Sequence, residues 1–132
     1  FGILNEDKAI NIEQNKALVE FAAPFSCTFH RAFDAVLDYE QALKDVISCG
    51  FSTILTSGTF PNVMEGKEVL KQLVIQANNR IEIMPGGGLR STNVLELNEM
   101  VNANWFHSSA ITDGSEIASP EEIVQLKKKL QS

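Results

Sequence analysis

Segments patterned like strands alternate with segments patterned like helices along the whole chain. Short apolar runs rich in β-forming residues lie at 25–29, 51–55, 81–84 and 104–107. Apolar residues at helical spacing lie between and after these runs, at 12–21, 39–48, 65–78, 93–101 and 120–130. Strands that alternate with helices in this way are joined by right-handed crossovers into a parallel sheet, so the sequence predicts the α/β class.

Two architectures fit this alternation. A TIM-type (β/α)8 barrel uses about 250 residues, so the 132 residues here correspond to about four of its eight units, the C-terminal half of a barrel. A doubly wound sheet of five strands fits the length as a complete domain. The chain has no initiator Met and opens on the strand-like Phe1-Gly2-Ile3-Leu4, which favours the half barrel. We therefore expect residues 1–132 to be a single segment of one barrel domain, with no second domain.

Charge and hydropathy exclude two classes of partner. The formal net charge is −6, and the only basic run is Lys127-Lys128-Lys129, so we expect no binding to nucleic acid. No apolar stretch approaches the ~20 residues of a membrane span, and no charged-then-apolar signal segment opens the chain. We expect a cytoplasmic protein that does not bind membranes.

Glycine and serine residues follow the last two predicted strands. In parallel α/β folds ligands bind beyond the carboxyl ends of the strands. Gly86, Gly87 and Gly88 can turn their amide groups toward an anion, and Ser91 or Thr92 can cap the helix that follows. With Ser108 and Ser109 they would form the phosphate site common in eight-stranded barrels. The alternative is that the glycines only allow a tight turn.

Charged and polar residues follow the first two predicted strands. His30 can act as a base, a metal ligand or a hydrogen-bond partner, and Arg31 can hold a carboxylate or phosphate through two hydrogen bonds. Asp34 can orient either of them, and Ser57 follows the next strand. The alternative is a salt-bridged rim that ties one strand-helix loop to the next.

His107 and the two cysteines are weaker candidates. By alternation His107 shares a side of its strand with Trp105, so its imidazole is predicted to pack in the barrel mouth, with or without a ligand. Thiolates would select Cu(I), but Cys27 is mid-strand and Cys49 is at a helix end. Both positions are typical of small buried apolar side chains, so the cysteines are only weak metal candidates.

Four of these motifs, in this order and spacing, resemble the CutC copper homeostasis protein family, from Phe1 to about Ala110. The motifs are Thr28-Phe29-His30-Arg31-Ala32-Phe33-Asp34, Ile54-Leu55-Thr56-Ser57-Gly58, Met84-Pro85-Gly86-Gly87-Gly88 and Phe106-His107-Ser108-Ser109-Ala110. The resemblance implies a cytosolic (β/α)8 barrel that binds Cu(I) and serves copper tolerance. The cysteines credited with copper in relatives lie largely outside this stretch, so the resemblance does not make Cys27 or Cys49 a copper ligand.

Three functions follow as hypotheses. The first is a copper homeostasis protein of CutC type, and the second is an enzyme or binder for a phosphorylated or carboxylated small molecule at the strand ends. The third is a purely structural subunit. Half of a parallel barrel exposes two strand edges and one apolar sheet face, so we expect the segment to form a homo-oligomer or to pair with the missing half of the barrel.

Overall fold

The computed structural model describes residues 1–131, and its centre is a three-stranded parallel sheet in the order β1-β2-β3. The strands are β1 (Thr28–Phe29), β2 (Thr53–Thr56) and β3 (Glu82–Pro85), with Phe29 opposite Ile54 and Ile54 opposite Ile83. The helices are α1 (Ile12–Ala22), α2 (Tyr39–Cys49), α3 (Lys67–Ala77), α4 (Val94–Val101) and α5 (Pro120–Gln131). A short 3-10 helix, η1 (Arg31–Ala35), follows β1.

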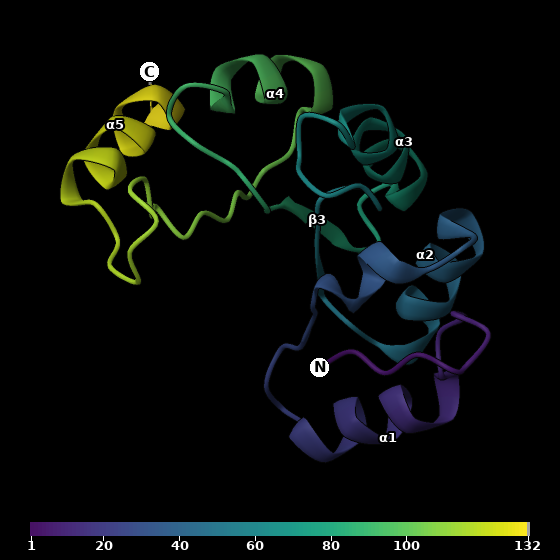
Figure 1. Ribbon diagram of the computed structural model, residues 1–132. Helices are drawn as coiled ribbons and strands as arrows, with labels where there is room; N and C mark the ends of the chain where they lie inside the picture. Colours follow the sequence, from purple (N-terminus) through teal and green to yellow (C-terminus); the bar gives the residue numbers. More distant parts are fainter. Residues whose placement is uncertain (132) are drawn as a thin grey trace.

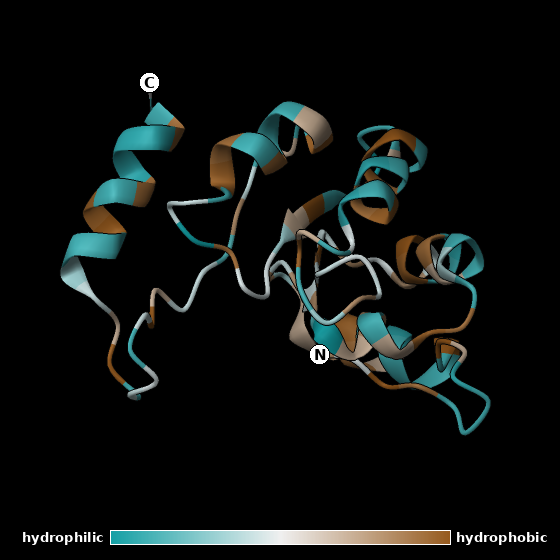
Figure 2. Cartoon of the chain, turned by 45° about the horizontal axis from the view of Figure 1, so that its top comes forward, coloured by the Kyte–Doolittle hydropathy of each residue, from teal (hydrophilic) through white to brown (hydrophobic). Residues whose placement is uncertain are grey.

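The helices lie in an arc around one side of the sheet, and the opposite side stays open (Figure 1). Phe29, Ile54 and Ile83, which are in register across the strands, are all buried toward the helices. Their neighbours in the alternation, Leu55 and Met84, are only partly buried. Coloured by hydropathy, the helices show apolar and polar sides (Figure 2). This one-sided cover differs from a doubly wound sheet, which carries helices on both faces.

Local signals explain where the helices begin and end. The side chains of Asn11 and Asp38 accept hydrogen bonds from Gln14 N and Gln41 N, which caps the first turns of α1 and α2. Gly50 ends α2 in the left-handed conformation, at φ +93°. The predicted helices therefore agree with the observed ones to within two residues at each end.

The first and last predicted strands are much shorter in the structure than in the sequence prediction. Only Thr28–Phe29 of the run 25–29 pairs as a strand, and the predicted strand 104–107 is reduced to a single parallel bridge between Gly86 and His107. Apolar content alone therefore overestimates these strands, because pairing also requires a neighbouring strand in register.

The first residue also pairs with the sheet. Phe1 donates its amino group to the Thr28 carbonyl at 2.9 Å and accepts from His30 N at 2.8 Å, which are the two bonds of a parallel pairing opposite Phe29. Ile3-Leu4, in contrast, turns away, and Leu4 forms an antiparallel bridge with Ile10. The strand character of the opening therefore lies at Phe1 rather than at Ile3-Leu4.

Within residues 1–131 no helix has the length and apolar character needed to cross a bilayer.

Candidate functional site

Asp34 is the centre of a hydrogen-bonded network that joins the loops after β1 and β2. Its Oδ1 accepts from Ser57 N at 3.0 Å, from Thr59 N at 3.1 Å and from the Thr56 hydroxyl. Its Oδ2 accepts from Arg31 Nε at 2.7 Å, and the carboxylate side chain is only 12% exposed. The carboxylate therefore orients Arg31 rather than His30, and it forms the rim that the sequence offered as an alternative.

Arg31 extends this network to the loop after β3. Its Nη2 donates to the Ser57 hydroxyl at 2.7 Å, and its guanidinium lies across Gly87, where an added Cβ would be 2.9 Å from Cζ and Nη1. The Arg31 side chain is 41% exposed, and its Nη1 donates to no acceptor among residues 1–131. Strict strand alternation would turn Arg31 to the opposite side of the sheet, unless the strand ends before it. β1 does end at Phe29, and the 3-10 helix that follows directs Arg31 to the strand ends.

The three glycines differ in their backbone hydrogen bonds: Gly86 pairs with the sheet, whereas Gly87 and Gly88 do not donate to it. Gly86 N donates to the Thr56 carbonyl at 3.0 Å, and the Gly87 carbonyl accepts from Val63 N at 2.9 Å. Gly87 and Gly88 have φ values of +112° and +70°, which favour glycine. Within the described residues the N–H groups of Gly87 and Gly88 donate to no protein acceptor, and neither residue is buried. They are therefore available to an anion beside Arg31.

Ser57 and Ser108 stand near these glycines, but their hydroxyls are already bonded. Ser57 is fully buried, and its hydroxyl donates to the Phe60 carbonyl. The Ser108 hydroxyl donates to the Leu89 carbonyl at 2.7 Å and accepts from Ala110 N. Ser109 is exposed and accepts weakly from Ile111 N at 3.4 Å. Of the three serines, Ser57 is buried, Ser108 is partly buried and only Ser109 is exposed.

The two histidines lie on different parts of the same edge. The Nδ1 atom of His30 accepts from Ala32 N at 3.0 Å, and its ring lies against Gly2. His107 lies beside Gly86, and both rings are exposed. Since His107 is exposed, the predicted packing of its imidazole is not seen within these residues, and Trp105 is also 62% exposed. No hydrogen bond or ring contact joins His30 to His107 within residues 1–131.

The cysteines do not form a metal site. Cys27 Sγ donates to the Phe25 carbonyl at 3.7 Å and Cys49 Sγ to the Ile12 carbonyl at 3.6 Å, and both thiols are buried and free. Burial raises the pKa of the Cys49 thiol above its usual value, with a further rise from Asp45, so it is protonated near neutral pH. No group of three or more His, Cys, Asp or Glu side chains in the described chain is arranged to hold a metal ion.

A second polar cluster lies beside the glycines, at the start of α4. Ser91 does not cap this helix, and neither does Thr92: the N-cap is Asn93, and no side chain makes the capping bond. Ser91 instead donates from N and Oγ to the Glu122 carboxylate of α5, at 2.6 and 2.7 Å. The Ser91 amide N–H lowers the pKa of the Glu122 carboxyl, helped by the Ser91 hydroxyl and by the charges of Arg90 and Lys129. The predicted cap is therefore wrong, because α4 begins only at Val94 and its N-cap position is Asn93.

Three residues of the strand-end loops were missed from the sequence. Thr56 and Thr59 both bind Asp34, and Arg90 donates to the Leu89 and Ile111 carbonyls at 2.7 Å. Arg90 could have been found, since it follows the glycines almost directly. Thr56 stands in one of the motifs at the strand ends, but nothing in the local sequence indicates that Thr56 or Thr59 binds Asp34.

Comparison with known proteins places these loops in one family. Residues 1–112 match the CutC family model. The mouse "Copper homeostasis protein cutC homolog" is 44% identical over 110 residues, which are 83% of this chain and 40% of that protein. The human homolog is 42% identical over the same shares.

A solved structure agrees with this match. The crystal structure named "Putative Copper Homeostasis Protein CutC", from Streptococcus agalactiae, is 31% identical with a TM-score of 0.78, over 85% of this chain and 55% of that chain. This chain thus spans about two fifths of the length of the curated relatives named above. On these matches, the chain belongs to the CutC family.

Proposed function

We propose that this chain serves copper homeostasis in the cytoplasm, and that its strand ends bind a phosphorylated or carboxylated small molecule. The observation that carries the second part is a set of adjacent donors without protein acceptors: Arg31 Nη1 and the N–H groups of Gly87 and Gly88. The copper homeostasis role rests on the names of the relatives.

The donor set suits one or two oxygen atoms of a carboxylate or phosphate. A guanidinium forms charge-assisted hydrogen bonds with carboxylate or phosphate, and backbone N–H groups add donors without a side chain. Asp34 and Ser57 accept from Nε and Nη2 of the guanidinium, and Nη1 remains beside Gly87 without an acceptor in the described residues. Because the geometry exists before a ligand arrives, binding does not require the arginine to be ordered first.

The residues of this chain do not fit a Cu(I) thiolate site. Such a site needs deprotonated sulfurs that converge, whereas Cys27 and Cys49 are buried against different carbonyls and Cys49 is protonated. We therefore route no step of the proposed function through copper bound to these thiols. The copper homeostasis role and the anion site are separate parts of the proposal.

We also propose that the sheet is part of a closed (β/α)8 barrel, completed by a second copy or by the missing half. Parallel sheets are covered on both faces in stable folds, and here Leu55 and Met84, which alternate with the residues buried toward the helices, are only partly buried. Size-exclusion chromatography with light scattering on the 132-residue chain should give an oligomer. A well-folded monomer with a cooperative melt would contradict this part.

The anion site is tested by titrating inorganic phosphate and acetate into the chain in a calorimeter. Arg31→Ala should abolish binding, and Gly87→Ala should weaken it strongly, because a Cβ there meets the guanidinium in an unfavourable backbone conformation. Lys71→Ala removes an equal charge from the exposed surface of α3 and is the matched control. Binding that survives in Arg31→Ala, or is lost equally in Lys71→Ala, would refute the site.

A further inference from the structure

We infer that the ligand of this site carries a flat apolar or aromatic body next to its anionic group, and that Phe60 contacts that body. The inference rests on the proposed anion site and specifies the class of molecule that it accepts. Phe60 belongs to the loop after β2, residues 57–66, which also supplies the groups that hold Arg31.

The loop is closed tightly at its neck. A Cβ on Gly58 would lie 2.3 Å from the Gly66 carbonyl oxygen, and a Cβ on Gly66 would lie 1.8 Å from the Ser57 carbonyl oxygen. The two ends of the loop therefore touch through their backbones, at positions that only glycine can occupy. A loop whose ends meet in this way has a fixed tip, and such loops are frequently functional.

The interior of the loop is anchored as well. Val63 is fully buried and donates its N–H to the Gly87 carbonyl at 2.9 Å. The Asn62 side chain accepts from Met64 N and Glu65 N, and Met64 packs against the core. Thr59 has a φ of +66°, which is uncommon for a β-branched residue, and Asp34 holds its N–H. The structure thus fixes the backbone on both sides of Phe60.

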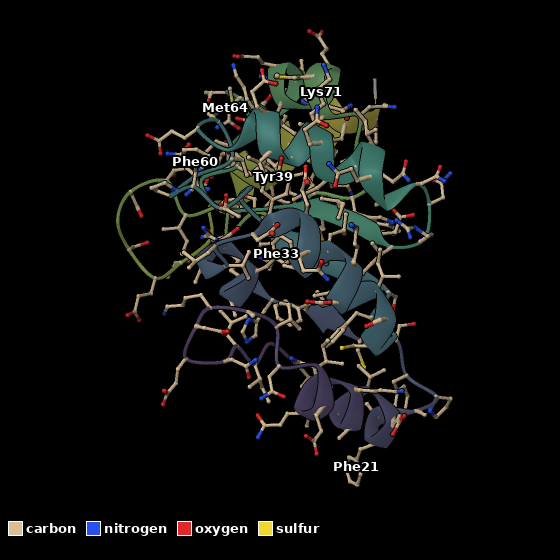
Figure 3. The ribbon with its side chains drawn as sticks, turned by 90° about the vertical axis from the view of Figure 1, so that its right-hand side faces the viewer. Phe21, Phe33, Tyr39, Phe60, Met64 and Lys71 are labelled. Carbon is tan, nitrogen blue, oxygen red and sulfur yellow. The ribbon has the colours of Figure 1, made fainter. Side chains whose placement is uncertain are left out.

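Phe60 is exposed, unlike the other large apolar residues of the loop. It is 47% exposed, while Val63 is fully buried and Met64 partly buried. Figure 3 shows Phe60 and Met64 on the same side of the molecule, far from Phe21 on α1. An apolar ring presented by a rigid loop keeps its exposed area available to a ligand.

One hydroxyl connects the Phe60 backbone to the guanidinium. The Ser57 Oγ donates to the Phe60 carbonyl and accepts from Arg31 Nη2 at 2.7 Å, and the next carbonyl, of Pro61, lies 3.5 Å from the same Nη2. The cation and the aromatic residue are therefore held by the same few atoms. A ligand whose anionic group pairs with Arg31 Nη1 and Gly87 brings its adjoining body to this loop, which favours phenyl or heterocyclic phosphates and carboxylates over bare anions.

The test compares phenyl phosphate with inorganic phosphate by calorimetry on the 132-residue chain. The unmodified chain should bind phenyl phosphate about five- to tenfold more tightly. Phe60→Ala should remove this difference and leave the inorganic phosphate affinity unchanged, and Phe60→Tyr should restore it. Phe21→Ala is the matched control, because Phe21 is a phenylalanine 93% exposed on another element.

The outcomes separate the two proposals. Equal affinity for both probes in the unmodified chain, or a preference that survives Phe60→Ala, would overturn the role of Phe60 and leave the anion site intact. A preference lost in Phe21→Ala would also overturn it. If neither probe binds, the anion site and the inference both fail.

Discussion

Two arginines follow the two outer strands of the sheet, β1 and β3, and are held in opposite ways. Arg31 is fixed by a carboxylate and a hydroxyl on one side of its guanidinium, and its Nη1 faces Gly87 without an acceptor in the described chain. Arg90 donates from Nη1 to the Leu89 carbonyl and from Nη2 to the Ile111 carbonyl. The difference teaches that an arginine near a glycine turn is a ligand candidate only when its partners leave donors free.

The carboxylates beside the two arginines also differ in whether they leave donors free. Asp34 collects donors from Arg31, Thr56, Ser57 and Thr59 and thereby fixes the position of a free guanidinium edge. Glu122 takes both donors of Ser91, so the start of α4 is already occupied by an anion of the protein itself. We call the group around Arg31 and Asp34 the Arg31 corner, and the group around Arg90, Ser91 and Glu122 the Arg90 corner. The first is arranged for a ligand and the second for joining α5 to the sheet edge.

The largest expected effect is on the Arg31 corner. Asp34→Ala leaves Arg31 and the loop donors without their acceptor and should lower the free energy of unfolding by about 3 kcal/mol. Urea unfolding followed by circular dichroism measures this. Asp38→Ala, which removes only the cap of α2, should cost about 1 kcal/mol. Equal costs for the two variants would show that the Asp34 network has no special stabilising role.

The arginines themselves should separate stability from binding. Arg90→Ala removes two charge-assisted bonds to carbonyls and should cost about 2 kcal/mol without changing phosphate affinity. Arg31→Ala should cost about 1 kcal/mol, since Asp34 keeps its other donors, and should abolish phosphate binding. Denaturation and calorimetry on the same two variants check both statements. Loss of phosphate binding in Arg90→Ala, with binding retained in Arg31→Ala, would contradict this assignment of roles to the two arginines.

Acid should loosen the Arg90 corner selectively. The pKa of Glu122 is lowered in the folded chain, so its contribution to stability is full above the ordinary glutamate pKa and is lost as pH falls through the lower folded value. Since the carboxylate is partly exposed, the loss should be no more than about 1 kcal/mol. Unfolding measured between neutral and acidic pH in the unmodified chain and in Glu122→Gln checks this, because the variant lacks this proton. An identical pH dependence in both would contradict it.

The cysteines should affect neither corner. Cys27→Ala and Cys49→Ala together should leave phosphate affinity unchanged, and the chain should retain the same amount of Cu(I) against a competing chelator as the unmodified chain. The protonated Cys49 thiol should react with alkylating reagents only when the chain unfolds. Loss of retained Cu(I) in the double variant would show that these thiols bind copper after all.

Much of the architecture was readable in advance, while the strand lengths were not. The helical spacing of apolar residues is a local signal, so the helices were predicted to within two residues at each end. The run 104–107 has strand composition but pairs only through His107, because strand formation depends on partners distant in sequence. The same reason hid the real partner of Ser91, which lies on α5.

The amino-acid sequence by itself determined the alternation of helices and strands, the polar ends of the strands and the resemblance to the CutC family, since these depend on local periodicity and on motifs. Only the tertiary structure decided which polar groups form hydrogen bonds within the protein and which remain available to a ligand. Ser57, Ser108 and Ser91 look alike as candidates in the sequence, yet each is bonded to a group that folding brings to it. Arg31 keeps a free edge because a 3-10 helix turns it onto Gly87, and hydrogen-bond satisfaction is a property of the folded arrangement rather than of the residue.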